Sequence, residues 1–182
     1  MKTTKKFTLT MRWALILVQI GMILSCTQHQ PKMDRSRTAM PSRLIMTGEL
    51  TAQQLLDNLA AYRSGKVAYQ PDPEALSALR SLGSDIQILV FLGTWCPDSE
   101  REVPRFLKIM ELTKGGPISY QLIGLDRSKR DAFGLAEKYQ IEFVPTFVVI
   151  QQDEEIGRIV ESATVSLEQD LLEIIESGIG KK

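Results

Sequence analysis

Two kinds of hydrophobic pattern alternate along the second half of this chain. Nearly continuous apolar runs predict two strands buried on both faces, at residues 86–92 (IQILVFL) and 118–125 (ISYQLIGL). Two short β segments, 146–150 and 156–160, are separated by five polar residues, a spacing that suits a hairpin. Amphipathic patterns predict helices at residues 97–112, 130–139 and 165–176. The predicted order is therefore β-α-β-α-β-β-α.

A small helical extension is predicted to precede these elements. Thr51 with Gln54 three residues later forms a capping box for one helix, and the sequence Pro71-Asp72-Pro73-Glu74 starts another that Gly83 would end. Tyr62, Lys66, Tyr69 and Asp72 form a polar and aromatic stretch between the two helices, which either packs as a loop or lines a groove.

The N-terminus has the pattern of an export signal. Four positive charges within residues 1–12 precede the apolar run Trp13 to Leu24, which is short for a membrane span. The run ends in Ser25-Cys26 and resembles the cleavage motif of bacterial lipoproteins, which implies that Cys26 becomes the acylated mature N-terminus. Two alternatives are an uncleaved anchor helix and a secreted protein in which Cys26 is incidental.

These patterns predict four parts and one location. They are a lipoprotein signal peptide (1–25), a lipid-anchored tether (26–46), the helical extension (47–84) and a single α/β domain (85–182). The protein is expected in the bacterial cell envelope, outside the cytoplasm, with a lipid at Cys26 holding it to a membrane. Thr27 in place of Asp favours the outer membrane.

Charge and composition narrow the functional classes. The chain has 22 basic and 22 acidic side chains, and removal of residues 1–25 leaves 18 against 22. This balance gives no electrostatic reason to expect nucleic-acid binding. Cys26 and the single histidine, His29, both lie near the N-terminus, so Cys96 is the only thiol of the predicted domain. Neither a metal site nor a cysteine-histidine protease site is expected.

Two motifs carry the chemistry. Thr94-Trp95-Cys96-Pro97-Asp98-Ser99 lies between a predicted buried strand and a helix, and Val144-Pro145-Thr146-Phe147 opens a later strand. Together they resemble the thioredoxin superfamily, in which Trp-Cys-x-x-Cys occupies the first junction and a cis-proline faces it. Glu102 and Pro104 are similar to the membrane-tethered TlpA and ResA type. The resemblance implies a thioredoxin-like fold, a central mixed sheet flanked by helices, with a cis Val144–Pro145 bond.

The sequence departs from the superfamily pattern at two positions. Ser99 replaces the second cysteine, and Val90 stands where many thioredoxins keep a buried acid. A sulfur at a helix N-terminus is stabilised as a thiolate, and the Ser99 hydroxyl is placed to donate a hydrogen bond to it. The Asp98 carboxylate opposes that charge, so the net effect stays open. Asp98, Glu100, Arg101 and Glu102 are predicted to form a solvated helix face.

A thiol without a partner cysteine predicts a specific kind of exchange. Cys96 would attack a disulfide, and an outside thiol would then release the adduct, because Ser99 cannot. The resemblance implies that the substrate is bound by Trp95, Pro97, Val144, Pro145 and Thr146, with no cofactor. The expected partners are protein or small-molecule thiols and disulfides. The alternative function is a non-catalytic binding module whose groove holds a peptide or an envelope partner.

Overall fold

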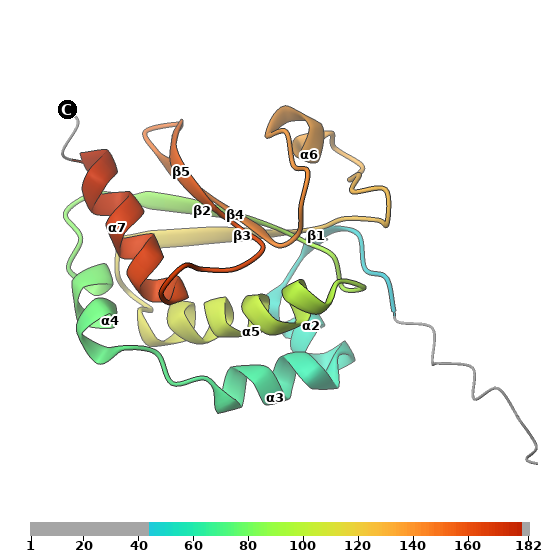
Figure 1. Cartoon of the computed structure of the whole chain (residues 1–182), viewed down its shortest axis with the longest axis horizontal. Helices are drawn as coiled ribbons and strands as arrows, with labels where there is room; N and C mark the ends of the chain where they lie inside the picture. The colour runs from blue at the N-terminus through green and yellow to red at the C-terminus, as the bar shows by residue number, and fades with distance from the viewer. Residues whose placement is uncertain (1–43, 180–182) are drawn as a thin grey trace, which may run out of the picture. The chain divides into compact units, whose positions relative to one another are not determined.

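A five-stranded mixed sheet forms the centre of the molecule, for which the computed structural model describes residues 44–179 (Figure 1). The strand order is β1-β3-β2-β4-β5. Strands β2 and β3 pair in parallel, and the other neighbouring pairs are antiparallel. The strands are β1 (Gly48–Leu50), β2 (Ile86–Leu92), β3 (Ile118–Gly124), β4 (Thr146–Gln151) and β5 (Glu154–Val160).

Helices cover both faces of this sheet, as the sequence pattern predicts. Figure 1 shows α5 and α7 on one face, with α6 on the other. One apolar core lies on the α5 side, and a second, smaller core on the α6 side contains Cys96. The helices are α2 (Ala52–Asn58), α3 (Ala60–Ala68), α4 (Pro73–Arg80), α5 (Pro97–Leu112), α6 (Leu135–Lys138) and α7 (Leu167–Ile179).

The central strand β2 positions the candidate site. It lies between β3 and β4, and all of its residues except Gln87 are buried, because each face packs against one of the two cores. The strand ends at Leu92 and α5 begins at Pro97, so residues 93–96 form a short connection at the carboxyl end of the strand. The predicted junction of the Cys96 motif is therefore confirmed.

Helix α3 was not predicted, and packing explains its presence. Its sequence combines three alanines with a central glycine, which lowers helix propensity, and it has few long apolar side chains to indicate a buried face. Tyr62 is nevertheless fully buried in the core, and a Cβ at Gly65 would lie 3.2 Å from Cβ of Pro104 in α5. A small residue at this contact lets the two helices approach closely, so tertiary packing stabilises a helix that local propensity does not indicate.

The segment 47–84 also contributes a strand. Strand β1 pairs with β3, in the register Gly48 with Gly124, and joins this segment to the sheet. Residues 44–46, assigned to the tether, are fixed by one side chain: Thr94 donates a hydrogen bond to the Leu44 carbonyl (2.6 Å) and accepts one from the Met46 N–H (3.1 Å). The chain thus runs beside the Cys96 loop before it enters β1.

Two other elements differ from their predicted bounds. Helix α6 spans four residues instead of 130–139, because the Asp131 carboxylate accepts backbone N–H groups from 133, 135 and 136 and holds 131–134 as a turn. The β4–β5 turn is shorter than predicted, since Gln152 and Asp153 adopt positive φ values of 52° and 65° and allow a tight hairpin.

The predicted signal peptide, the lipidation site Cys26 and residues 26–43 of the tether lie outside the described residues. Within residues 44–179, no helix is long and apolar enough to cross a membrane.

Candidate thiol site

The loop that carries Cys96 is closed by two hydrogen bonds. The Cys96 N–H donates to the Gly93 carbonyl (2.9 Å), and the Gly93 N–H donates to Ser99 Oγ (3.1 Å). Ser99 is fully buried in the first turn of α5. The hydrogen bond found at the Ser99 hydroxyl therefore joins the two ends of the loop, whereas the sequence analysis placed this hydroxyl against the Cys96 sulfur.

Cys96 faces the loop that precedes β4. Its thiol donates a hydrogen bond to the Val144 carbonyl, with 3.1 Å between Sγ and the oxygen, across 48 positions of sequence. The Val144–Pro145 peptide bond is cis, as the resemblance implies. Cys96 as a whole residue is 8% exposed, so the site is buried against all but a small contact with solvent. The two sequence motifs thus meet in space, with the sulfur between them.

The start of α5 surrounds the sulfur with partial positive charge. Cys96 is the N-cap residue, and its side chain does not cap the helix. The first N–H groups of a helix have no acceptor within it, and the Cys96 side chain accepts none of them. The Asp98 carboxylate, which would oppose a negative charge on the sulfur, forms an ion pair with Arg101 (2.8 Å).

Trp95 covers one side of the site. Its indole N–H donates to the Leu125 carbonyl (3.1 Å), and its ring packs against Gly93, where a Cβ would lie 2.7 Å from the indole. The Arg127 guanidinium lies 5.6 Å from the ring centroid. These contacts hold the half-buried ring in one orientation beside the sulfur.

The remaining predicted site residues divide between surface and interior. Pro97 is exposed at the first position of α5. Thr146 is buried, and its hydroxyl donates to the Phe143 carbonyl (2.8 Å), which stabilises the turn around Pro145. Val90 is fully buried in the apolar core on the α5 side, so this position supplies no charge beneath the site.

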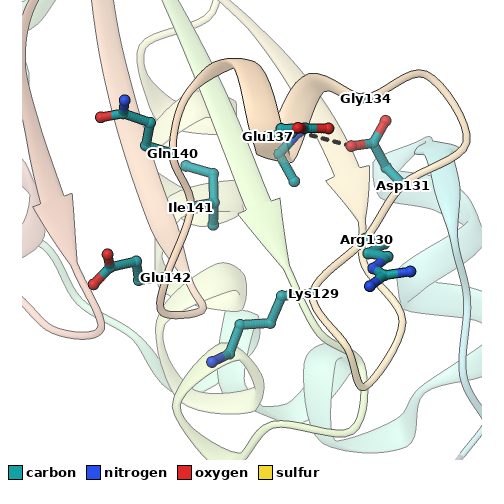
Figure 2. A pocket seen from close by; sticks show the side chains of 9 residues that line it. Lys129, Arg130, Asp131, Gly134, Glu137, Gln140, Ile141 and Glu142 are labelled. Atoms are coloured by element: carbon teal, nitrogen blue, oxygen red, sulfur yellow. Dashed lines mark hydrogen bonds between the residues drawn. The ribbon is translucent and has the colours of Figure 1, made fainter.

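Sequence reasoning missed a hollow next to the Val144 loop. It has a volume of about 520 Å³ and lies between the segment 129–131 and the segment 140–142 (Figure 2). Figure 2 shows Arg130 and Asp131 on one side of it, Gln140, Ile141 and Glu142 on the opposite side, and Lys129 at the edge between them. The available signal was the group of three cations within residues 127–130, which the sequence analysis did not consider.

One predicted surface residue is buried. Glu102 is 2% exposed and accepts hydrogen bonds from Arg101 (2.7 Å) and Arg105 (3.1 Å), so its assignment to a solvated helix face was wrong. A second buried carboxylate, Glu168, accepts from the Tyr69 hydroxyl (2.7 Å) and the Asp72 N–H (2.9 Å). The two hydrogen bonds of Glu168 connect the α3–α4 segment to the start of α7. Each of the two buried carboxylates therefore has hydrogen-bond donors.

The described residues offer no obvious metal site. Between residues 44 and 179, no group of three His, Cys, Asp or Glu side chains lies close enough to hold a metal ion. Cys96 is a free cysteine within that part of the chain. The chemistry available at this site is that of one thiol beside polar backbone groups.

A mixed sheet flanked by helices, with a cysteine at a helix N-terminus facing a cis-proline, defines the class of thioredoxin-fold proteins. A thioredoxin family model matches residues 48–169, and the chain belongs to this family. The matched region begins at β1 and therefore includes α2, α3 and α4. No curated protein matches the chain.

Solved structures agree with this fold. An HIV epitope-scaffold aligns with a TM-score of 0.53 and 18% identity, over 71% of this chain and 93% of the other. A Pseudomonas aeruginosa protein of unknown function aligns with a TM-score of 0.50 and 18% identity, over 74% of this chain and 89% of the other. Thioredoxin 2 of Pseudomonas aeruginosa aligns with a TM-score of 0.38 and 23% identity, over 63% and 94%. The first two similarities support the fold alone.

Proposed function

We propose that this protein is a monothiol thiol–disulfide exchange protein of the bacterial cell envelope, held to a membrane by a lipid on Cys26 and similar to the TlpA and ResA type. The observation that carries the proposal is the position of Cys96. Its sulfur lies at the N-cap of α5 and 3.1 Å from the carbonyl oxygen of Val144, next to a cis-proline. This arrangement puts the sulfur at a helix N-terminus and beside a polar backbone edge for a substrate.

The exchange step needs one thiolate and one substrate disulfide. Cys96 gives up its proton, and its sulfur attacks one sulfur of the substrate; the substrate S–S bond breaks as the Cys96–substrate S–S bond forms. The leaving thiolate takes a proton from water. Ser99 cannot attack the new bond, so an external thiolate attacks its substrate sulfur. The external–substrate S–S bond forms as the Cys96–substrate S–S bond breaks, and the released Cys96 thiolate takes a proton from water.

The Val144 carbonyl has a second role in this proposal. In the resting site this carbonyl accepts a hydrogen bond from the Cys96 thiol. Once the thiolate forms, the carbonyl is free to accept a hydrogen bond from an N–H group of an extended substrate segment. Trp95 and Thr146 contribute to the shape of the site. Trp95 covers one side of it, and Thr146 fixes the turn around Pro145.

A binding module is the second candidate, and one observation favours it. Only 8% of Cys96 is exposed, and its thiol is already hydrogen bonded to Val144. A protein that only binds would retain the same groove and need no reaction at the sulfur.

The discriminating experiment uses the full chain with Cys26→Ser, so that Cys96 is the only thiol. The protein is mixed with excess neutral 2-hydroxyethyl disulfide, and adducts are read by intact mass. We expect one adduct, which persists until an external thiol is added, and none in the Cys96→Ser control.

A Ser99→Cys variant sharpens this result. Its new thiol lies three positions after Cys96, so it should release the adduct within the chain and leave an internal disulfide. Absence of the adduct in the folded protein, combined with normal adduct formation after unfolding in urea, would establish the binding module instead.

A further inference from the structure

We infer that the loop Asp126–Asp131 selects substrates whose disulfide is flanked by acidic residues. This inference rests on the proposed exchange function and names the substrate class of the same site. It is carried by the charges around the site and by the contacts that hold three cations beside Cys96.

The loop carries a small excess of positive charge, three basic against two acidic side chains, within an acidic domain. Residues 44–179 contain 12 basic and 21 acidic side chains, yet residues 127–130 supply three of those basic side chains. Among residues 44–179, Arg127, Lys129 and Arg130 form none of the ion pairs, whereas Arg101, Arg105 and Arg158 are each paired with a glutamate. Their charges therefore remain available to a ligand.

The two acids of the loop are used by its own backbone. The Asp126 carboxylate accepts the N–H groups of Ser128 (2.8 Å) and Arg130 (2.9 Å). The Asp131 carboxylate accepts those of 133, 135 and 136, at 2.7–3.2 Å. Both carboxylates keep the loop folded and are directed at backbone donors, so they do not pair with the neighbouring cations.

Two of the cations lie over the aromatic rings that flank the thiol. Arg127 lies over Trp95 at 5.6 Å from the ring centroid, and Lys129 lies over Phe143 at 5.5 Å. Trp95 precedes Cys96, and Phe143 precedes Val144, whose carbonyl accepts a hydrogen bond from the Cys96 thiol. Each cation thus contacts the ring next to one of the two groups that define the site.

The hollow beside the loop provides room for a substrate side chain. Its volume of about 520 Å³ is within the range of ligand sites, and Glu142 at its edge is two residues from Val144. Two residues of chain span at most about 7 Å, so the edge of the hollow at Glu142 lies near the Val144 loop, although Cys96 itself does not line it. Figure 2 shows Lys129 and Arg130 at two different edges of it, with Arg130 next to Asp131.

The hollow also contains acids, and their positions limit where a substrate carboxylate can bind. Glu137 and Glu142 are exposed and belong to its other walls, and Asp131 is occupied by the backbone. A carboxylate is therefore favoured only at the Lys129 and Arg130 side chains themselves, and Asp131, which keeps its negative charge, lies beside Arg130. Elsewhere the excess of acidic side chains repels it, so the loop also fixes the direction in which the substrate binds.

The test uses the full chain with Cys26→Ser and three peptides of one length. Each peptide carries one cysteine as a mixed disulfide with thionitrobenzoate, flanked by Glu, Gln or Lys. The release of thionitrobenzoate gives the rate, which is divided by the rate of the same peptide with 2-mercaptoethanol. We expect the Glu peptide to react about five times faster than the Lys peptide, as weak exposed ion pairs allow.

Charge reversal provides the decisive comparison. Lys129→Glu should remove or invert this preference, and Arg127→Glu should reduce it. Lys114→Glu is the matched control, because it makes the same change in net charge just after the C-terminal end of α5, away from Cys96. Equal normalised rates for the three peptides, or the same loss of preference in Lys114→Glu, would overturn the inference.

Binding separates this inference from the exchange chemistry. The same peptides with serine in place of cysteine are titrated into protein carrying Cys96→Ser and followed by NMR. Tighter binding of the Glu peptide, weakened by Lys129→Glu, supports the inference even if Cys96 reacts with no disulfide and the exchange function fails. Equal binding of the Glu and Lys peptides contradicts it.

Discussion

Ser99 Oγ accepts a hydrogen bond from the Gly93 N–H at 3.1 Å, and both residues are buried. The residue at the position of the missing second cysteine therefore closes the loop that presents Cys96. This contact gives Ser99 a structural role that is independent of any chemistry at the sulfur.

Ser99→Ala should lower the free energy of unfolding by about 1–3 kcal/mol, because it leaves a buried N–H without an acceptor. Urea unfolding followed by circular dichroism measures this change. Ser64→Ala is a suitable control, since Ser64 is an exposed helix residue whose hydroxyl bonds to carbonyls one turn earlier. A loss at Ser99 no larger than the loss at Ser64 would show that the loop does not depend on this bond.

Tyr69→Phe should destabilise the protein by about 1–3 kcal/mol at neutral pH, because the buried Glu168 carboxylate loses a donor. Burial, the hydrogen bond to Glu168 and the charge of Glu168 raise the pKa of Tyr69 well above its usual value of 10.0. The folded state therefore holds this proton more tightly than the unfolded state, and the stabilisation is complete below pH 10 and is lost as the pH rises further.

The alkaline dependence separates this effect from simple loss of packing. Unfolding measured from pH 7 to 11 should show that the difference between wild type and Tyr69→Phe shrinks above pH 10. Tyr120→Phe is a second titrating case, because burial alone raises the pKa of the Tyr120 hydroxyl, so its difference from wild type should also shrink above pH 10. At neutral pH its cost should be smaller than that of Tyr69→Phe, since no hydrogen bond to a carboxylate is lost. A constant difference for Tyr69→Phe across this range contradicts the assignment.

Asp131→Ala should cost about 1–2 kcal/mol at neutral pH, since one carboxylate serves several N–H groups before α6. Burial opposes ionisation, but the hydrogen bonds from 136, 133 and 135 outweigh it and lower the pKa of Asp131 below 3.8. The stabilisation is present above about pH 3.8 and is lost as the pH falls through the lower folded value.

Acid unfolding therefore gives the readout for Asp131. Wild type and Asp131→Ala should converge in stability as the pH falls below 3.8, while the exposed Glu137→Gln control should follow wild type throughout. A difference that stays constant down to the lowest accessible pH contradicts the predicted role.

Gly65→Ala should destabilise the protein by about 1 kcal/mol or more, although alanine is the better helix former by about that amount. The new Cβ would lie 3.2 Å from Cβ of Pro104 and force α3 away from α5. Thermal unfolding measures the sign of the change. Gly83→Ala, with no atom within 4 Å of its Cβ position, should change little. A stabilising Gly65→Ala would mean that the helices adjust freely.

The elements that sequence predicted well are those whose signal is local. Strand β2 is apolar on both faces, and the capping box of Thr51 with Gln54 is present as expected. Elements that depend on contacts with distant segments were missed. Strand β1 forms because it pairs with β3, and helix α3 forms because Gly65 allows it to pack against Pro104. The burial of Glu102 was missed for the same reason, since two arginines satisfy it.

The candidate site shows the same division. The two motifs around Cys96 and Pro145 were readable from sequence, and the structure brings them within hydrogen-bond distance. The partner of Ser99 was not readable, because it depends on how the loop folds back on Gly93. The positions of Arg127 over the Trp95 ring and of Lys129 over the Phe143 ring could not be predicted from sequence either, because they join distant segments.

The most direct test of the account is the reaction rate of the single thiol in the folded and the unfolded chain. Protein with Cys26→Ser is mixed with 4,4′-dithiodipyridine at neutral pH, with and without urea, and the rates are corrected using a small thiol in each solvent. The account predicts faster reaction in the folded state, because the start of α5 favours the thiolate. Slower reaction in the folded state than in urea would show a shielded, inert cysteine and would contradict the proposed exchange chemistry.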